Sequence, residues 1–430
     1  MTNVRNDHWT IDGGQPLTGE YPVQTAKNSA LYLILASILT EEEVVLHRVP
    51  RLSDMQVGFD ILEHLGVDVQ HEDDLVRLRA KRIATSHAPF KLVRKMRASF
   101  VAMGALIGRV GEARIGVPGG CAFGPRPVDR HVAAFESLGV QITEDEGDFV
   151  ASTRGPLEGH VVFSSPTVGG TQNVLLASAR GSRKVVIENA ALEPEVADLI
   201  DLLNLMGAQI QGKGTSVLTV NGVPELHGAE FTPIADRIEA GTMLMAIAAT
   251  RGHGAVTQVR PDHLTAVLDQ LQSNGVLVTI DGSTVHVDAS GPLNARDLTA
   301  KPYPGFPTDL QAPYGALLAT LPGRSTVQDD VYPDRFTHAS ELQKLGATVA
   351  IDGRTMRIDG GTLVGAEVHA ADIRAGGALV VAALAAQGQT LLTGIEYLDR
   401  GYERFESRLV QLGARVTRVA GAEKPSLLYA

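Results

Sequence analysis

Apolar and polar positions along the chain follow one pattern that occurs six times. Each copy has a leucine-rich helical pattern that ends in Leu or Met, then a glycine, then a short stretch in which apolar and polar residues alternate. Period-two alternation predicts a strand, and a near-constant repeat length indicates one folding unit that has been copied. The fourth copy departs slightly, because Ser273-Asn274 replace the Leu or Met. The six glycines lie 73, 68, 68, 71 and 67 residues apart, at Gly66, Gly139, Gly207, Gly275, Gly346 and Gly413.

Every copy also contains an earlier helical pattern that is rich in alanine and leucine. These first helices are expected at Ala30–Leu39, Ser99–Ile107, Gln172–Ala179, Thr242–Ala249, Pro313–Leu321 and Ala378–Ala386. A β-branched strand should follow each one, at Val44–Val49, Ala113–Val117, Lys184–Glu188, Ala255–Val259, Ser325–Gln328 and Thr390–Thr393. Alternating helices and strands predict helices packed against mixed sheets. Six copies divide most simply as three plus three, with a domain boundary near 231–235.

Composition narrows the class of protein. The 430 residues are 44% apolar and 20% charged, which is ordinary for a globular protein. The formal net charge of −11 argues against nucleic acid or an anionic membrane as a partner, because both require a basic face. The single cysteine excludes an internal disulfide and favours a reducing compartment. There is no signal-peptide pattern, and the longest apolar stretch, Ala30–Leu39, is too short for a bilayer. We therefore expect a soluble cytoplasmic protein.

The segments just before the first helices carry unusual charges. Four of the six contain Lys or Arg where a helix N-terminus would prefer Ser, Thr, Asp or Asn: Lys27, Lys95 with Arg97, Arg237 and Arg374. The other two read Thr167-Val168-Gly169 and Pro307-Thr308-Asp309. A cation beside a helix N-terminus is unfavourable unless an anion binds nearby, so this pattern indicates an anion site. Solvated surface cations would explain only one or two of the four.

A second loop in each copy contains an acidic residue, usually with an arginine nearby. For Arg51, Arg260 and Arg335 we predict local pairing with a neighbouring Asp, which would anchor the next helix.

The corresponding loop of the second copy is longer and contains the only cysteine. Cys121 lies among glycines and prolines, close to Arg126 and Arg130. Nearby cations favour the thiolate, so this residue is a candidate reactive or acid–base thiol. A buried, inert cysteine remains the alternative.

Other chemistries have little support. The thirteen histidines show no metal-ligand spacing, and one cysteine cannot build a zinc site. Gly119–Gly124 lacks the strand–helix context of a dinucleotide loop, and there is no phosphate-binding loop of the Walker type. No metal or cofactor is expected.

Taken together, these segments resemble the enolpyruvyl transferase family over nearly the whole chain. The motifs that carry the resemblance are Ala26-Lys27-Asn28-Ser29-Ala30, Met96-Arg97-Ala98-Ser99, Pro118 to Asp129 around Cys121, Asp236-Arg237-Ile238-Glu239, Phe306-Pro307-Thr308-Asp309, Asp372-Ile373-Arg374 and Asp399 to Arg404. The resemblance implies an α/β (α+β) fold, a two-domain inside-out α/β barrel with three βαβαββ-like repeats per domain. One domain would be discontinuous, comprising residues 1–26 and 235–430, and the other would comprise residues 27–234.

The resemblance also implies an activity. The enolpyruvyl group of phosphoenolpyruvate would pass to the 3′-hydroxyl of UDP-N-acetylglucosamine with release of phosphate, a step of peptidoglycan precursor synthesis that fosfomycin blocks. The two compounds would be the substrates, without a cofactor.

Roles for individual residues follow from the resemblance. Asp309 would be the base, Cys121 the acid, and Lys27 and Arg400 further catalytic groups. The phosphate and carboxylate would be held by Lys27, Arg97, Arg126 and Arg400, and Arg374 would also bind substrate. The nucleotide and sugar would contact Asn28, Arg126, Pro127, Val128, Asp129, Arg130, Thr167, Val168, Gly169, Asp309 and Val331.

Several positions depart from the usual family pattern, among them Gln24-Thr25, Arg130, Leu192 and Tyr332-Pro333-Asp334. They leave open a different acceptor, such as another uridine nucleotide, or a non-catalytic nucleotide-sugar-binding relative. The sequence does not determine the oligomeric state.

Overall fold

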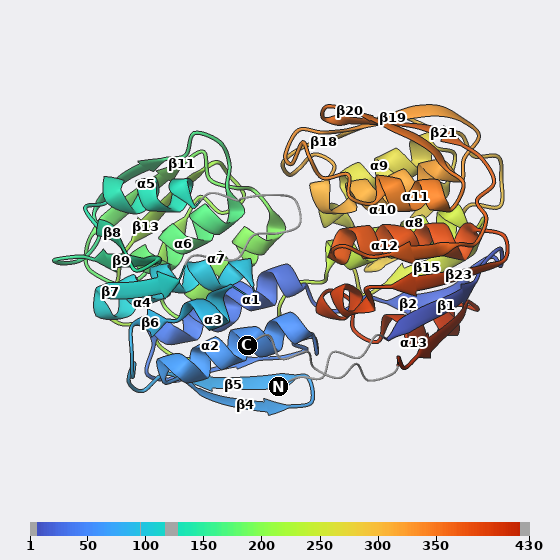
Figure 1. Ribbon diagram of the computed structural model, residues 1–430. Coiled ribbons are helices and arrows are strands. Elements are labelled where there is room, and N and C mark those ends of the chain that lie inside the picture. The colour runs from blue at the N-terminus through green and yellow to red at the C-terminus, as the bar shows by residue number, and fades with distance from the viewer. Residues whose placement is uncertain (1–6, 95, 117–127, 422–430) are drawn as a thin grey trace. The chain divides into compact units, whose positions relative to one another are not determined.

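A computed structural model describes residues 7–94, 96–116 and 128–421, with only the backbone of Arg97. The chain forms two compact units. Unit 1 comprises Met1–Gln24 and Ala235–Ala430, and unit 2 comprises Thr25–Ile234. Figure 1 shows the helices and strands of the two units. Each unit has its own hydrophobic core.

Unit 2 contains three four-stranded sheets within its described residues, with orders β14-β3-β5-β4, β6-β7-β9-β8 and β10-β11-β13-β12. Its helices are α1 (Lys27–Ala36), η1 (Ser37–Leu39), α2 (Ser53–Leu65), α3 (Phe90–Val93), η2 (Arg97–Val101), α4 (Ala102–Val110), α5 (Asp129–Ser137), α6 (Val168–Ser178) and α7 (Pro194–Leu205). Its strands are β3 (Glu43–Leu46), β4 (Asp68–Glu72), β5 (Leu75–Arg79), β6 (His87–Ala88), β7 (Glu112–Gly116), β8 (Gln141–Asp145), β9 (Asp148–Ser152), β10 (Gly159–Val162), β11 (Lys184–Glu188), β12 (Gln209–Gln211), β13 (Val217–Asn221) and β14 (Ala229–Phe231).

Unit 1 likewise contains three four-stranded sheets in its described part, with orders β16-β17-β15-β2, β18-β19-β21-β20 and β22-β23-β1-β24. Its helices are α8 (Arg237–Ala249), η3 (Pro261–His263), α9 (Thr265–Ser273), η4 (Thr308–Leu310), α10 (Gln311–Ala319), α11 (Ala339–Lys344), α12 (Ile373–Ala385), η5 (Ile395–Arg400) and α13 (Phe405–Gln411). Its strands are β1 (His8–Asp12), β2 (Thr18–Pro22), β15 (His253–Thr257), β16 (Leu277–Asp281), β17 (Thr284–Asp288), β18 (Leu298–Ala300), β19 (Gly323–Asp329), β20 (Thr348–Asp352), β21 (Thr355–Gly360), β22 (Glu367–His369), β23 (Gln389–Thr393) and β24 (Arg415–Val419).

All six sheets share one topology. An edge strand pairs in parallel with its neighbour, and the other two pairings are antiparallel, as in β10 with β11, β11 with β13 and β12 with β13. In unit 1 the last sheet is completed by β1 from the start of the chain, where Trp9 lies opposite Leu392 and Arg418. Each copy is therefore a βαβαββ repeat, and the predicted fold class is confirmed.

The first helices of the repeats pack against one another at the centre of each unit. In unit 1, α8, α10 and α12 are in mutual contact, and every residue of α8 is buried. In unit 2, α4 packs closely against α6. A Cβ atom on Gly104 would lie 2.1 Å from the backbone oxygen of Asn173, so only glycine permits this approach. The helices thus lie inside and the sheets outside, as an inside-out barrel requires.

The six glycines that follow the second helices of the repeats share one backbone conformation. Their φ angles lie between +82° and +100°, a left-handed region that favours glycine after a helix. Five of the six first helices begin earlier than predicted, whereas α4 begins at Ala102, after the 3-10 helix η2 and later than the predicted Ser99. Asp236 and Asp372 cap α8 and α12 by accepting backbone N–H bonds, so Arg237 and Arg374 lie within the first helical turn. Lys27 similarly is the first residue of α1.

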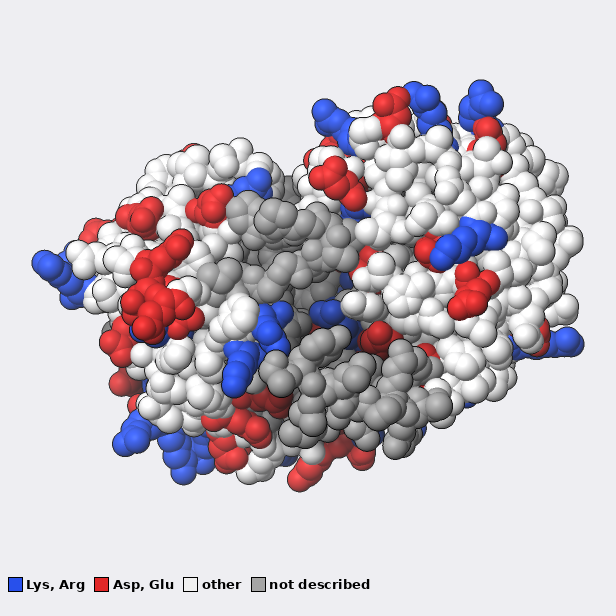
Figure 2. All heavy atoms as spheres, viewed as in Figure 1, with Lys and Arg blue, Asp and Glu red and all other residues white. Residues whose placement is uncertain are grey.

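Acidic and basic side chains are interspersed over the described surface that Figure 2 shows. Among the described residues, none of the helices has both the length and the apolar character needed to cross a bilayer.

Candidate active site

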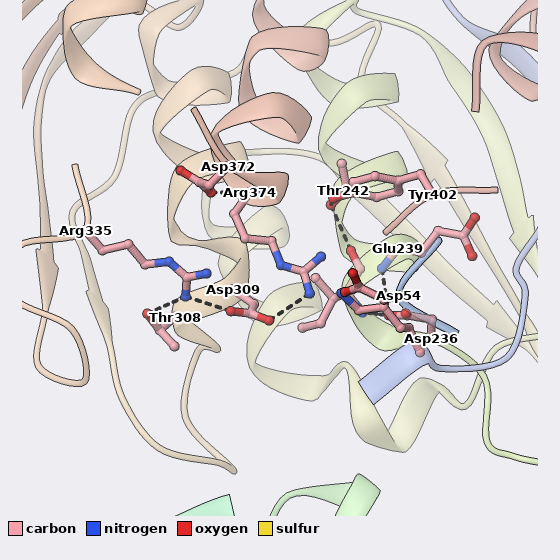
Figure 3. Close-up of polar contacts among 12 residues, drawn as sticks. Asp54, Asp236, Glu239, Thr242, Thr308, Asp309, Arg335, Asp372, Arg374 and Tyr402 are labelled. Atoms are coloured by element: carbon pink, nitrogen blue, oxygen red, sulfur yellow. Dashed lines mark hydrogen bonds and ion pairs between the residues drawn. The ribbon is translucent and has the colours of Figure 1, made fainter. Parts of the chain in front are cut away.

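In unit 1, Asp309 lies between two buried arginines (Figure 3). Its Oδ1 accepts a hydrogen bond from Nη1 of Arg335 at 2.6 Å, and its Oδ2 accepts one from Nη2 of Arg374 at 2.8 Å. Both arginine side chains are 7% exposed, whereas that of Asp309 is 24% exposed. Burial alone would raise the pKa of Asp309, but the two guanidinium groups outweigh it and hold the pKa well below its usual range. Asp309 is therefore ionised in this arrangement.

Several polar groups fix the two arginines. Nη1 of Arg335 also donates to the Thr308 hydroxyl, 3.3 Å away. Oδ1 of Asp372 caps α12 by accepting from the backbone N–H of Arg374 at 2.8 Å, and the side chain of Arg374 is hydrogen-bonded to Tyr402. Burial would lower the pKa of Arg374, but Asp309 raises it above its usual value. The guanidinium groups are thus permanent, positioned cations.

Asp329 connects Asp309 to the loop that contains Val331. The hydroxyl of Thr308 donates to Oδ2 of Asp329 at 2.5 Å, while Oδ1 of Asp329 accepts from the backbone N–H groups of Val331 and Tyr332 at 2.8 Å. The expected sugar-contacting residue Val331 therefore belongs to the same hydrogen-bonded assembly as Asp309.

Arg400 is the last residue of η5, two positions before Tyr402, whose hydroxyl lies 3.2 Å from the hydroxyl of Thr242 on α8. Unit 1 thus brings Asp309 and Arg374 into direct contact and places Arg400 in the segment that leads to Tyr402.

In unit 2, Lys27 forms a buried ion pair. Its Nζ lies 3.0 Å from Oδ2 of Asp54, which is in the first turn of α2, and the side chains are 8% and 6% exposed. Asn28 follows in α1, and the next residue, Ser29, hydrogen-bonds Asp198 of α7. Oδ2 of Asp198 also accepts from the backbone N–H of Ile234 at 3.1 Å, and burial raises the pKa of Asp198 to about 7. These contacts fix the first turn of α1.

The residues expected to line the nucleotide site lie at the N-termini of α5 and α6. Val128 precedes α5, and Asp129 and Arg130 form its first turn. Thr167 caps α6, where its hydroxyl accepts from the N–H of Gly170 at 3.3 Å, and Val168 and Gly169 begin the helix.

His131 of α5 connects the two helix ends. Its Nδ1 lies 3.0 Å from Nδ2 of Asn173 on α6, and its ring packs beside Gly169. The first turn of α5 therefore packs against the first turns of α6, which places the two groups of residues expected at the nucleotide site close together.

Some predicted residues cannot be placed. Cys121, Arg126 and Pro127 lie outside the described residues, and so does the side chain of Arg97, whose backbone begins η2. Among the residues that are described, no group of three or more His, Cys, Asp or Glu side chains could hold a metal ion.

The sequence pattern predicted a local ion-pair partner for three arginines, and the structure confirms only one of these predictions. Local pairing was correct for Arg260, which binds Asp262 at 3.2 Å. It was wrong for Arg335, which pairs with Asp309, and for Arg51, which pairs with Asp73 in the turn between β4 and β5. In the loop of Arg51, the acidic neighbour Asp54 pairs with Lys27 instead. The repeated sequence pattern did not indicate which of the three arginines pairs with a neighbouring Asp and which two pair with a distant one.

Comparison with known proteins agrees with this architecture. A family model described as EPSP synthase (3-phosphoshikimate 1-carboxyvinyltransferase) matches residues 11–409. A protein of Deinococcus radiodurans named UDP-N-acetylglucosamine 1-carboxyvinyltransferase is 49% identical over 410 residues, which cover 94% of this chain and 96% of the relative. A protein of the same name from Thermus thermophilus is 48% identical over 406 residues, with 94% and 95% coverage.

Two solved structures share the fold. The enolpyruvyl transferase NikO from Streptomyces tendae matches with a TM-score of 0.87 and 24% identity, covering 97% of this chain and 100% of the other. EPSP synthase from Acinetobacter baumannii matches with a TM-score of 0.73 and 15% identity, covering 96% of this chain and 100% of the other. Because the family model spans nearly the whole sequence and the relatives are close to half identical, the chain belongs to the enolpyruvyl transferase family.

Proposed function

We propose that this protein transfers the enolpyruvyl group of phosphoenolpyruvate to the 3′-hydroxyl of UDP-N-acetylglucosamine, the first committed step of peptidoglycan precursor synthesis. The name shared by relatives that are 43–49% identical supports this acceptor. The observation that carries the chemistry is the carboxylate of Asp309 held between two buried arginines, a base and two anion-binding cations in one assembly.

The reaction needs a base and an acid. Asp309 takes the proton of the acceptor hydroxyl while the oxygen bonds to C2 of phosphoenolpyruvate, and the thiol of Cys121 delivers a proton to the methylene carbon. The product of this addition is a tetrahedral adduct. In the elimination, the Cys121 thiolate takes a proton back from the new methyl group, the double bond forms again, and the C2–O bond breaks so that phosphate leaves with the bonding electrons.

Lysine and arginine side chains would stabilise the charge of this adduct. Phosphoenolpyruvate carries about three negative charges, which charge-assisted hydrogen bonds from Lys and Arg neutralise. Arg374 and Arg335 form a pair suited to a carboxylate, and Lys27, Arg97, Arg126 and Arg400 would bind the remaining oxygens. Arg335 enters this set only because of its contact with Asp309.

The N-termini of α5 and α6 would hold the nucleotide. Backbone N–H groups at Asp129–Arg130 and Val168–Gly169 suit a diphosphate. Asn28 and Val331 would contact the amino sugar.

A phosphate-release assay tests the proposal. With phosphoenolpyruvate present, release should require UDP-N-acetylglucosamine and should not occur with UMP or shikimate 3-phosphate. Asp309→Asn should abolish release in a protein that still folds. Release with another acceptor alone would overturn the proposed acceptor, and undiminished release by the variant would overturn the proposed base.

A further inference from the structure

Asp309, Arg335 and Arg374 form a cluster, called the Asp309 cluster below. In this cluster the Asp309 carboxylate lies between the two arginines as a bound carboxylate ligand would. Each oxygen of Asp309 accepts from a different guanidinium group, at 2.6 Å from Arg335 and at 2.8 Å from Arg374. A small organic acid would use the same pair of cations in the same way, because carboxylates bind arginine through both oxygens. Asp309 and such a ligand therefore require the same donors.

The three partners are not equally fixed. Arg335 is tied to Thr308, and Arg374 is tied to Tyr402 and to the capped start of α12. Asp309 lies on the short helix η4 and is the most exposed of the three side chains, 24% against 7%. Of the three side chains, the Asp309 carboxylate is therefore the one that solvent or a ligand reaches most readily.

The charges of Asp309, Arg335 and Arg374 also favour competition between Asp309 and a ligand. Two guanidinium groups and one carboxylate leave a net charge of +1 in the cluster, and a bound carboxylate ligand would bring it to zero. Two carboxylates beside the same two cations also repel each other at short range. The affinity of the arginine pair for an external anion should therefore be lower while Asp309 occupies it.

We propose that Asp309 competes with the carboxylate of phosphoenolpyruvate for the Arg335–Arg374 pair, so that binding of the donor substrate displaces the base and makes it available. This inference rests on the proposed function and adds a regulatory step to the same site. Once the guanidinium charge is shared with a substrate, Asp309 loses the interactions that hold its pKa low and becomes a stronger base. The base is thus activated only when the donor substrate is present.

Calorimetric binding of phosphoenolpyruvate and of pyruvate, without any acceptor, tests this competition. Asp309→Asn keeps the side-chain shape and removes the charge, and Asp309→Ala removes the competing group entirely. Both variants should bind each ligand at least tenfold more tightly than the wild type, although both lack the base. Asp334→Asn is the matched control, because it removes an equal charge from an exposed position beside Arg335 in sequence, and it should change affinity less than twofold.

The outcomes are separable. Unchanged or weaker binding by Asp309→Asn and Asp309→Ala, in protein whose thermal unfolding shows it to be folded, overturns the competition even if the wild type turns over. Equal tightening by Asp334→Asn also overturns it, because the effect would then be one of general charge. If the wild type releases no phosphate with any acceptor, the proposed function fails, while tighter pyruvate binding by the variants would still establish the competition.

Discussion

The buried pair of Lys27 and Asp54 allows a quantitative prediction about unit 2. Their charged atoms are 3.0 Å apart, with side chains 8% and 6% exposed. At that distance the Coulomb energy is about 5 kcal/mol for an effective dielectric constant of about 20. Desolvation offsets much of it while the pair is intact, but removing the Asp54 charge takes away the counter-charge 3.0 Å from a buried ammonium group, and breaking a buried pair in this way costs roughly 3–5 kcal/mol. Asp54→Asn should therefore lower the unfolding free energy of unit 2 by about 3 kcal/mol.

The molecule offers an internal reporter for this experiment. Trp9 is the only tryptophan and is fully buried in the core of unit 1. In urea, far-UV circular dichroism follows both units, whereas tryptophan fluorescence follows unit 1. Asp54→Asn should shift part of the dichroism transition to lower urea and leave the fluorescence transition in place.

Two further variants decide the interpretation. Asp201→Asn breaks a Lys–Asp pair of the same unit, 2.7 Å long but 50% and 45% exposed, and should cost less than about 1 kcal/mol. Lys27→Met in the Asp54→Asn background should recover part of the loss, because the buried ammonium charge is then removed as well. If Asp54→Asn costs no more than Asp201→Asn, the argument from burial is refuted.

Three further outcomes are expected. Fosfomycin should add its mass to the wild-type protein and not to Cys121→Ser, and an intact-mass spectrum without an adduct on the wild type would contradict an active-site thiol. The folded protein holds the proton of Asp198 up to a pKa of about 7, whereas the unfolded chain loses it near 3.8. The stability from this group is therefore full below about pH 4 and is lost as pH rises to about 7. Denaturation of unit 2 across that range should show the decline in the wild type and a flatter profile in Asp198→Asn, and equal profiles would argue against the raised pKa. Gly104→Ala would place a Cβ 2.1 Å from the backbone oxygen of Asn173, so the melting temperature should fall by an amount equivalent to about 1–3 kcal/mol, whereas Gly155→Ala, with nothing within 4 Å, should leave it nearly unchanged.

The repeated fold could be predicted from the amino-acid sequence. Local chemistry is enough for this, because a glycine that must adopt positive φ ends each second helix and period-two alternation marks the strand that follows. Resemblance of the motifs then indicated the family and candidate residues such as Lys27, Asp309 and Arg374.

The pairing of charged residues, in contrast, could be seen only in the folded chain. Arg335 and Arg260 have similar local sequences, yet Arg260 binds its neighbour Asp262 while Arg335 binds Asp309, 26 residues away. Likewise, the start of α1 and the first turn of α2 had to pack together before Lys27 could pair with Asp54. Ion pairs of this kind depend on distance in space and on burial, which sequence separation does not encode. For that reason, the two arginine partners of Asp309 could not be predicted from the sequence. The same is true of the low pKa that they give this carboxylate.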